Sequence, residues 1–359
     1  MVTEAPLLEV RALKVVYGSG RKKRVAIDDV SVTVVAGQTL GLVGESGSGK
    51  STLANAILGL VPVERGEIRL AGQDISHASF EQRRPFYRQL QAVFQDPYSS
   101  LNPVRTVGQT LAEPLWALGE RNRGVIGDRV RAMLASVGLP PEAEHQYPRQ
   151  FSGGQRQRVA IARALMPSPR LVICDEATSA LDMSIQAGVL NLLQDLQASR
   201  RLSFLFISHD LEVVRHLCDW VVVLYGGQVM EQGPTATVFD APAHPYTRAL
   251  QLASPVADPR LQRDRRRQAE NSTRAGGPRV HVGKSCPFAP RCPYAQTRCW
   301  DERPLLRTSD GPGQVACHRF PEWRSEPEEG PVPVHSRVST ATASAAYQPQ
   351  AFLDARSMA

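Results

Sequence analysis

The chain has 359 residues, of which 42% are hydrophobic and 21% charged, and its formal net charge is +7. A chain of this size can bury a sizeable core, and the composition excludes a disordered or fibrous protein; the length fits two domains, or one large domain with an appendage. No apolar run reaches the ~18 residues of a membrane span, and the N-terminus lacks the pattern of a secretory signal, so we expect a cytosolic chain.

Apolar runs rich in β-branched residues alternate with helical patterns from Leu7 to about Leu224, which predicts an α/β fold around a central sheet. A strand ending at Val43 runs into a glycine-rich turn, and residues 51–60 are predicted to form a helix. The stretch from about 95 to 150 is punctuated by prolines and predicts a helical insert. Strand patterns resume at 171–174 and 204–207.

The glycine-rich turn has the spacing of a phosphate-binding loop, Gly-x-x-x-x-Gly-Lys-Ser, between a strand and a helix. Its backbone N–H groups and the helix N-terminus would cradle phosphates, Lys50 would reach the β- and γ-phosphates, and Ser51 would ligate Mg²⁺. The expected nucleotide-binding residues are Gly44, Glu45, Ser46, Gly47, Ser48, Gly49, Lys50, Ser51 and Thr52.

A second apolar strand pattern, 171–174, ends in the two carboxylates Asp175 and Glu176. Together with the phosphate-binding loop, this pattern predicts that Asp175 holds Mg²⁺ opposite Ser51. Glu176 is then the expected general base that polarises the attacking water.

Just before that strand, Ser152, Gly153, Gly154 and Gln155 follow Phe151 and lead into a predicted helix at Arg156. A Ser-Gly-Gly turn at a helix start is a second anion cradle. Here the sequence resembles the ATP-binding-cassette (ABC) superfamily, whose signature this is, although Phe151 stands where leucine is commonest. The resemblance covers about residues 7 to 250.

The remaining family positions match in chain order. Tyr17 fits the aromatic residue that stacks on adenine, and Gln95 the glutamine that senses Mg²⁺ and the transporter. Asp182 lies in the segment that crosses the dimer interface, and His209 fits the switch histidine at the γ-phosphate. The resemblance implies an ABC-type P-loop NTPase core (RecA-like) with a helical signature subdomain. It also implies a head-to-tail dimer, in which Ser152 to Gln155 face the partner's ATP.

Two segments resemble the F-type ATP-binding subunits of dipeptide and oligopeptide (peptide/nickel) importers. These segments are 94–103, an extended glutamine loop, and 244–250, which begins His-Pro-Tyr-Thr. The resemblance implies an ATPase coupled to transport, bound peripherally to the cytoplasmic face of the inner membrane. Expected partners are a D-type second ATPase, two transmembrane permeases and an extracytoplasmic binding protein. The cargo stays open between dipeptides, oligopeptides, nickel and metallophores, and the alternative is a soluble ABC ATPase of translation or DNA repair.

The six cysteines fall into two groups. Cys174 and Cys218 lie among apolar residues and are predicted to be core residues. The other four are close together near the C-terminus: Cys286, Cys292, Cys299 and Cys317. A cytosolic chain disfavours disulfides, and four thiolates in one small module suit a tetrahedral site. Their wide spacing favours a [4Fe–4S] cluster, known at the matching cysteines of several relatives, over zinc or empty thiols.

The expected organisation therefore has four parts. Residues 1–255 form the nucleotide-binding domain, with a helical subdomain at about 96–160, and residues 285–324 a small Cys-rich C-terminal extension. Between them lies an arginine-rich linker, 256–284, and residues 325–359 are predicted to be disordered. The linker has no aromatic residues to stack on bases, so we expect no nucleic-acid partner.

Overall fold

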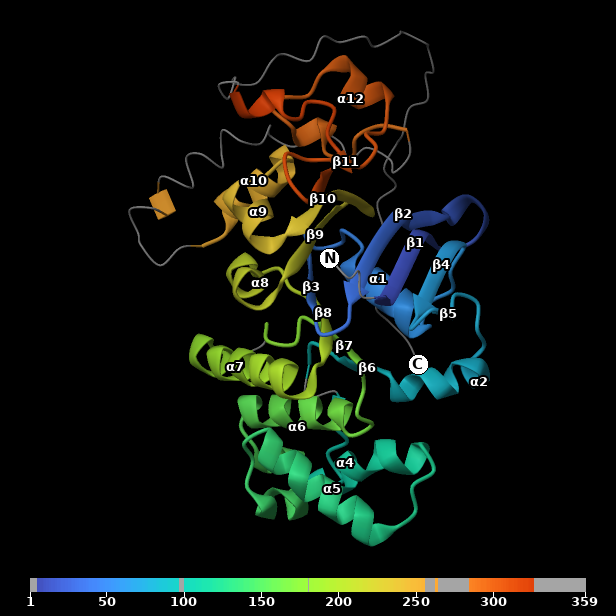
Figure 1. Cartoon of the computed structure of the whole chain (residues 1–359), viewed down its shortest axis with the longest axis vertical. Helices are drawn as coiled ribbons and strands as arrows, with labels where there is room; N and C mark the ends of the chain where they lie inside the picture. Colours follow the sequence, from blue (N-terminus) through green and yellow to red (C-terminus); the bar gives the residue numbers. More distant parts are fainter. Residues whose placement is uncertain (1–4, 97–99, 180, 256–261, 264–283, 326–359) are drawn as a thin grey trace, which may run out of the picture.

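The computed structural model describes residues 5–96, 100–179, 181–255, 262–263 and 284–325 (Figure 1). Its strands are β1 (Pro6–Tyr17), β2 (Arg24–Val35), β3 (Thr39–Val43), β4 (Arg65–Leu70), β5 (Gln73–Asp74), β6 (Leu90–Val93), β7 (Leu171–Asp175), β8 (Ser203–Ile207), β9 (Trp220–Tyr225), β10 (Gln228–Pro234), β11 (Arg307–Thr308) and β12 (Gln314–Val315). The α-helices are α1 (Lys50–Leu58), α2 (Phe80–Arg83), α4 (Val107–Ala117), α5 (Arg123–Ser136), α6 (Gly153–Leu165), α7 (Met183–Arg200), α8 (Leu211–Leu217), α9 (Thr235–Asp240), α10 (Pro245–Ala253) and α12 (Thr297–Asp301). Short 3₁₀ turns are η1 (Gly20–Lys22), η2 (Arg84–Arg88), η3 (Pro141–His145), η4 (Pro148–Gln150), η5 (Ala289–Arg291) and η6 (Glu322–Ser325).

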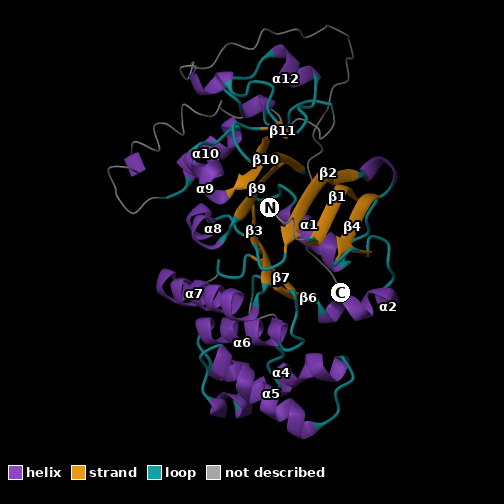
Figure 2. Ribbon diagram, viewed as in Figure 1, coloured by secondary structure: helices purple, strands orange, loops and turns teal. Residues whose placement is uncertain are grey.

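The strands form two sheets (Figure 2). The larger has the order β11-β12-β10-β9-β3-β8-β7-β6, and its strands from β9 to β6 run parallel. The smaller, antiparallel sheet has the order β2-β1-β4-β5. In a parallel sheet the carboxyl ends of neighbouring strands share one edge, and ligands bind in the crevice outside that edge.

The central strands are buried on both faces, as the near-continuous apolar runs of parallel strands require. In β7, Leu171 and Ile173 pack into the core shared with α1 and the antiparallel sheet. The intervening Val172 and Cys174 pack into the core on the opposite face, which continues into the helical region and the C-terminal extension. Cys174 and Cys218 are both buried in that second core, which confirms the prediction for these two residues.

Helices α4, α5 and α6 lie at one end of the molecule, and the C-terminal extension around α12 lies at the other (Figure 1). Helix α4 begins at a capping box, in which Thr106 and Gln109 each accept the other's backbone N–H. The side chain of Asn122 caps α5 by accepting the backbone N–H groups of Gly124 and Val125. Within the described ranges, no helix is both long enough and apolar enough to cross a membrane.

The C-terminal extension is joined to the central sheet. Strand β12 pairs with β10, so β11 and β12 extend the larger sheet beyond β10. The indole N–H of Trp323 donates to the carbonyl of Ala243 at 2.8 Å, and the Arg303 guanidinium pairs with Asp28 of β2 at 3.0 Å. Most of the predicted linker, and the predicted tail from 326 on, lie outside the described residues.

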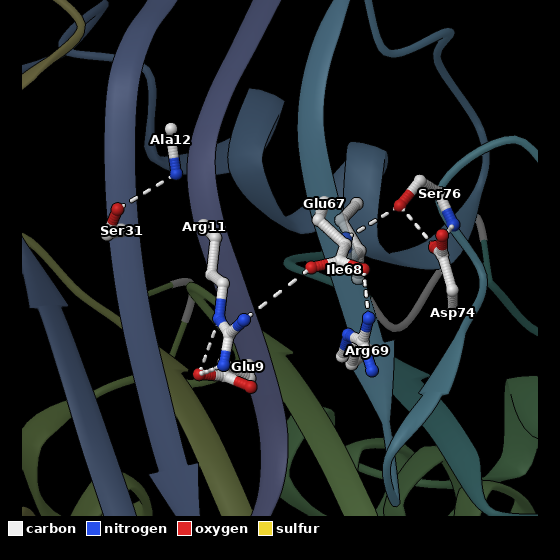
Figure 3. Close-up of polar contacts among 9 residues, drawn as sticks. All are labelled: Glu9, Arg11, Ala12, Ser31, Glu67, Ile68, Arg69, Asp74 and Ser76. Atoms are coloured by element: carbon white, nitrogen blue, oxygen red, sulfur yellow. Dashed lines mark hydrogen bonds and ion pairs between the residues drawn. The ribbon is translucent and has the colours of Figure 1, made fainter.

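The antiparallel sheet carries its own polar contacts (Figure 3). Strand β1 bulges at Ala12, whose φ is +46°, and the hydroxyl of Ser31 on β2 accepts the Ala12 N–H at 2.9 Å. This bond satisfies a backbone donor that the bulge removes from the strand ladder. Arg11 donates to Glu9 on the same strand and lies 3.9 Å from a carboxylate oxygen of Glu67 on β4.

Candidate nucleotide-binding site

The glycine-rich turn connects the C-terminal end of β3 to the first residue of α1. Gly49 caps the helix with φ at +107°, and a Cβ there would lie 2.7 Å from the side chain of Ile27 and 2.9 Å from the carbonyl of Ala26. Only glycine can adopt this positive φ without strain and leave the space free that a Cβ would fill. The remaining predicted residues lie in the same turn or the first turn of α1: Gly44, Glu45, Ser46, Gly47, Ser48, Lys50, Ser51 and Thr52.

The Lys50 side chain lies within this loop and is 5% exposed. Its ammonium donates to the carbonyls of Gly44 at 2.7 Å and Glu45 at 3.0 Å. Burial lowers the pKa of Lys50. Nearby carboxylates act in the opposite direction, in the order Glu176, Asp175 and Glu45. A buried ammonium beside a helix N-terminus is a strong attractor for phosphate.

The end of β7 brings both predicted carboxylates to this loop. The Ser51 hydroxyl donates to Asp175 at 3.3 Å. Burial raises the pKa of Asp175, while the bond from Ser51 acts in the opposite direction. A serine hydroxyl and a carboxylate side by side form a donor set that suits Mg²⁺. This pair was expected from the sequence, and it joins residues 124 positions apart.

Glu176 lies next to His209, with 3.4 Å between a carboxylate oxygen and Nδ1. Its backbone has φ at +49°, which an ordinary residue adopts only when its surroundings impose it. The Glu176 N–H donates to the carbonyl of Ile207 at 3.0 Å, and Ser179 donates to the Glu176 carbonyl through its N–H and its hydroxyl. Strand β8, through Ile207, and the turn after β7, through Ser179, therefore hold the Glu176 backbone in this conformation.

Tyr17 and Gln95 border the site. The exposed Tyr17 ring is placed beside α1, with its hydroxyl 3.4 Å from that of Thr52. Gln95 is exposed just after β6, the strand next to β7. The segment that follows it, 97–99, lies outside the described residues, so the predicted extended glutamine loop is described only in part.

The signature segment forms the start of α6. Ser152 caps the helix, its hydroxyl accepting the N–H of Gln155 at 3.3 Å, and the Gln155 side chain accepts the N–H of Ser152 at 2.9 Å. The helix begins at Gly153, three residues before the start expected at Arg156, because this reciprocal capping box already orders the Gly-Gly pair.

Gly154 allows a close approach between α6 and α7. A Cβ at Gly154 would lie 2.3 Å from the side chain of Ile185, and one at Gly153 would lie 3.7 Å from Leu181. Asp182 caps α7 by accepting the N–H of Ile185 at 3.0 Å. The signature and the segment around Asp182 therefore pack on each other within one chain; Ala180 of that segment lies outside the described residues.

The four C-terminal cysteines are buried within one small region. The N–H of Cys286 donates to the carbonyl of Cys299 at 2.9 Å. Burial raises the pKa of Cys286 to about 11 and that of Cys317 to about 12. Burial is the largest cause of the raised pKa of Cys292; the Tyr294 N–H lowers this pKa, and the charges of the other three thiols raise it further.

Backbone N–H groups point at these sulfurs: Phe288 and Ala289 at Cys286, and Tyr294 at Cys292. Such bonds favour thiolates and are found around iron–sulfur clusters. In the part of the chain that the structure describes, however, no three His, Cys, Asp or Glu side chains have an arrangement that could hold a metal ion.

Two further side chains reach the phosphate-binding loop and were not predicted to do so. The N–H of Glu45 donates to the Tyr246 hydroxyl at 2.9 Å, and Arg291 donates to the Glu45 carboxylate at 2.7 and 2.8 Å. Tyr246 belongs to the His-Pro-Tyr-Thr segment, which the sequence linked only to a family. No local signal in the sequence places Arg291 there.

The fold and the site define the ATP-binding cassette class of ATPases. The features that carry this are the phosphate-binding loop, a Ser–Asp pair suited to Mg²⁺, a glutamate directly after β7 and a capped Ser-Gly-Gly helix. Residues 27–179 match the family model described as "ABC transporter", and residues 230–299 match "Oligopeptide/dipeptide transporter, C-terminal region". The chain is similar to a dimeric ATP-binding cassette, MJ0796, in a post-hydrolysis state with ADP and phosphate. That match has 27% identity and a TM-score of 0.58, and covers 64% of this chain and 98% of the other.

Curated relatives cover more of the chain. It is 47% identical over 299 residues to the di/tripeptide transport ATP-binding protein DppF of Pseudomonas aeruginosa, covering 83% of this chain and 91% of the relative. It is 44% identical over 313 residues to the oligopeptide transport ATP-binding protein OppF of Salmonella typhimurium, covering 84% and 93%. The chain belongs to the ABC transporter family, in the branch of ATP-binding proteins that carry the oligopeptide/dipeptide C-terminal region.

Proposed function

We propose that this chain is the ATP-hydrolysing subunit of an importer for dipeptides or oligopeptides. The observation that carries the proposal is the joint presence, in one chain, of the ATPase site and the C-terminal region of the peptide-transport branch. The relatives named for di/tripeptide and oligopeptide transport support the cargo class. A nickel or metallophore cargo is the related possibility, because the ATPase itself never contacts the cargo.

The proposed mechanism divides the reaction among the phosphate-binding loop, the Mg²⁺ ligands and Glu176. The loop from Gly44 and the ammonium of Lys50 bind the phosphates of ATP, the substrate. Ser51, Asp175 and Gln95 would hold Mg²⁺, which neutralises phosphate charge when bound. Glu176 takes a proton from the attacking water, which then displaces ADP from the γ-phosphate.

A single chain supplies only half of each ATP site. The signature residues Ser152 to Gln155 would bind the ATP of a second, D-type ATPase, whose own signature would face Lys50. Closure of this head-to-tail pair assembles the site, and hydrolysis reopens it. We propose that two permeases convert this cycle into transport, that an extracytoplasmic binding protein delivers the cargo, and that this chain is peripheral on the cytoplasmic face of the inner membrane.

The test is affinity purification of the tagged chain from its native membranes, with mass spectrometry of the proteins that accompany it. We expect two multi-span permeases and a second cassette ATPase. Uptake assays with radiolabelled di- and tripeptides then test the cargo in cells with and without the chain. Ribosomal or DNA-repair proteins in place of permeases would contradict the importer and favour the soluble ATPase.

The cofactor of the C-terminal extension is a second prediction. We propose that a [4Fe–4S] cluster is held by Cys286, Cys292, Cys299 and Cys317. Its role would be structural, to stabilise the fold of the C-terminal extension. All four thiols are buried, and backbone N–H groups are directed at three of them, Cys286, Cys292 and Cys317, which supports the proposal. Protein purified without oxygen should contain iron and acid-labile sulfide in about equal amounts, about four of each per chain. Zinc without sulfide would instead support a Cys₄ zinc site, and the absence of all three elements would contradict both.

A further inference from the structure

The C-terminal extension contacts the phosphate-binding loop at Glu45. Arg291 contacts both oxygens of its carboxylate, at 2.7 and 2.8 Å, and Tyr246 accepts its backbone N–H at 2.9 Å. Glu45 and Arg291 are 246 positions apart in the chain. Their side chains are only partly exposed, 40% and 32%, so the pair is less screened by solvent than a fully exposed ion pair.

An aromatic cluster fixes the Arg291 side chain. Its guanidinium lies 5.7 Å from the ring centroid of Phe288 and 5.8 Å from that of Tyr225. Phe288 is fully buried and in turn contacts the rings of Tyr246 and His244. Because cation–π contacts and the carboxylate act on the same guanidinium, Arg291 is held in place before any nucleotide arrives.

The position of Arg291 also connects this pair to the cysteines. Arg291 ends the turn η5 and immediately precedes Cys292, whose N–H donates to the Phe288 carbonyl at 3.0 Å. The same turn begins after Cys286, whose sulfur accepts the N–H of Phe288. The turn that carries Arg291 is thus hydrogen-bonded to two of the four cysteines, Cys286 and Cys292.

The charge of Glu45 is close enough to Lys50 to influence the pKa of its ammonium. Without a counter-charge, a carboxylate in the phosphate-binding loop would repel the phosphates of ATP and compete for Lys50. Arg291 supplies the counter-charge and holds the carboxylate on the side of the C-terminal extension.

We infer that Arg291 is a positioning residue of the nucleotide site, through which the four-cysteine extension sets the affinity of the phosphate-binding loop for ATP. The extension is thus part of the ATP site as well as a C-terminal appendage. This inference rests on the ATPase function and adds a regulatory element to it.

The experiment compares variants in the purified complex by titration with MgATP and MgADP and by steady-state ATPase kinetics. Arg291→Met keeps the aliphatic stem but removes the charge, and we expect the Kd for both nucleotides and the KM for ATP to rise about five- to tenfold. The value of kcat should change less than about twofold, since Arg291 touches no reacting atom. Arg291→Lys, which keeps the charge, should recover part of the affinity.

The matched control is Arg298→Met, which breaks an exposed ion pair with Glu302 in the same extension. It should bind nucleotide like the wild type. The decisive variant is the double substitution Glu45→Gln with Arg291→Met. Its Kd for MgATP should equal that of Glu45→Gln alone, because Arg291 acts only through the carboxylate that this substitution removes. Thermal unfolding of each variant separates a local effect from loss of the fold.

Two results would overturn the inference: Arg291→Met binding MgATP as tightly as Arg298→Met does, or Arg291→Met lowering the affinity by the same factor whether residue 45 is glutamate or glutamine. Should Arg291→Met not fold, the same comparison is made with Arg291→Lys, Glu45→Gln and the double substitution of the two. A wild-type complex that binds no ATP would instead contradict the ATPase function itself, so the two failures are distinguishable.

Discussion

Glu176→Gln is expected to abolish ATP turnover in the assembled complex and to leave ATP binding intact. Glutamine has the same shape, so the backbone at φ +49° and its bonds to Ile207 and Ser179 stay in place. What is lost is the carboxylate that accepts the proton of the attacking water, and general-base catalysis contributes about 10²- to 10⁴-fold. We expect kcat to fall by about this factor or by more. The Kd for MgATP should stay within about threefold of the wild-type value.

The matched control is Glu212→Gln, an exposed glutamate in the first turn of α8, which should hydrolyse ATP like the wild type. Turnover is measured as phosphate release and binding as equilibrium titration with MgATP. Turnover near the wild-type value in Glu176→Gln would refute its role as the base. The neighbouring His209, 3.4 Å from the carboxylate, would then be the next candidate.

Lys50→Ala is expected to act on the other half of the reaction, nucleotide binding. Its ammonium is the positive side chain buried within the phosphate-binding loop, where it also bridges the carbonyls of Gly44 and Glu45. A hydrogen bond to a charged group contributes about 1.5–3 kcal/mol, which corresponds to a loss of MgATP affinity of about 10- to 150-fold. ATPase activity falls with it, because less substrate is bound and one phosphate contact is missing.

The control for Lys50→Ala is Lys23→Ala, which removes an exposed lysine whose partner, Glu64, is 3.8 Å away. An exposed pair of this kind contributes little, so both affinity and unfolding temperature should stay unchanged. If Lys50→Ala bound MgATP as tightly as Lys23→Ala, the assignment of the phosphate-binding loop would be wrong. The Kd for MgADP, measured in parallel, shows whether the lost contact involves the γ-phosphate alone.

The two substitutions separate the two functions of the site. Glu176→Gln keeps the bound state and removes hydrolysis, whereas Lys50→Ala weakens the bound state itself. In the transport cycle proposed above, the first variant should accumulate the closed head-to-tail pair with ATP, and the second should stay open. Cross-linking between the two ATPases in the presence of MgATP would distinguish these states.

Much of the site could be predicted from the sequence because each of its motifs is contiguous. A strand, a glycine-rich turn and a helix start at Lys50 specify a phosphate cradle by local backbone geometry alone. The strand that ends at Asp175 and Glu176 likewise carries its chemistry within six residues. Helix boundaries were predicted less well than motifs. The Ser152–Gln155 capping box starts α6 at Gly153, three residues before the predicted position.

Local patterns in the chain were enough to predict the α/β class, the motifs around Lys50, Glu176 and Ser152, and the group of four cysteines. The tertiary structure alone decided that β12 pairs with β10 and that Arg291 reaches Glu45. The physical reason is that helices, turns and strands follow from neighbouring residues. A contact across 246 positions depends instead on how buried faces pack, and no local pattern in the chain records that packing.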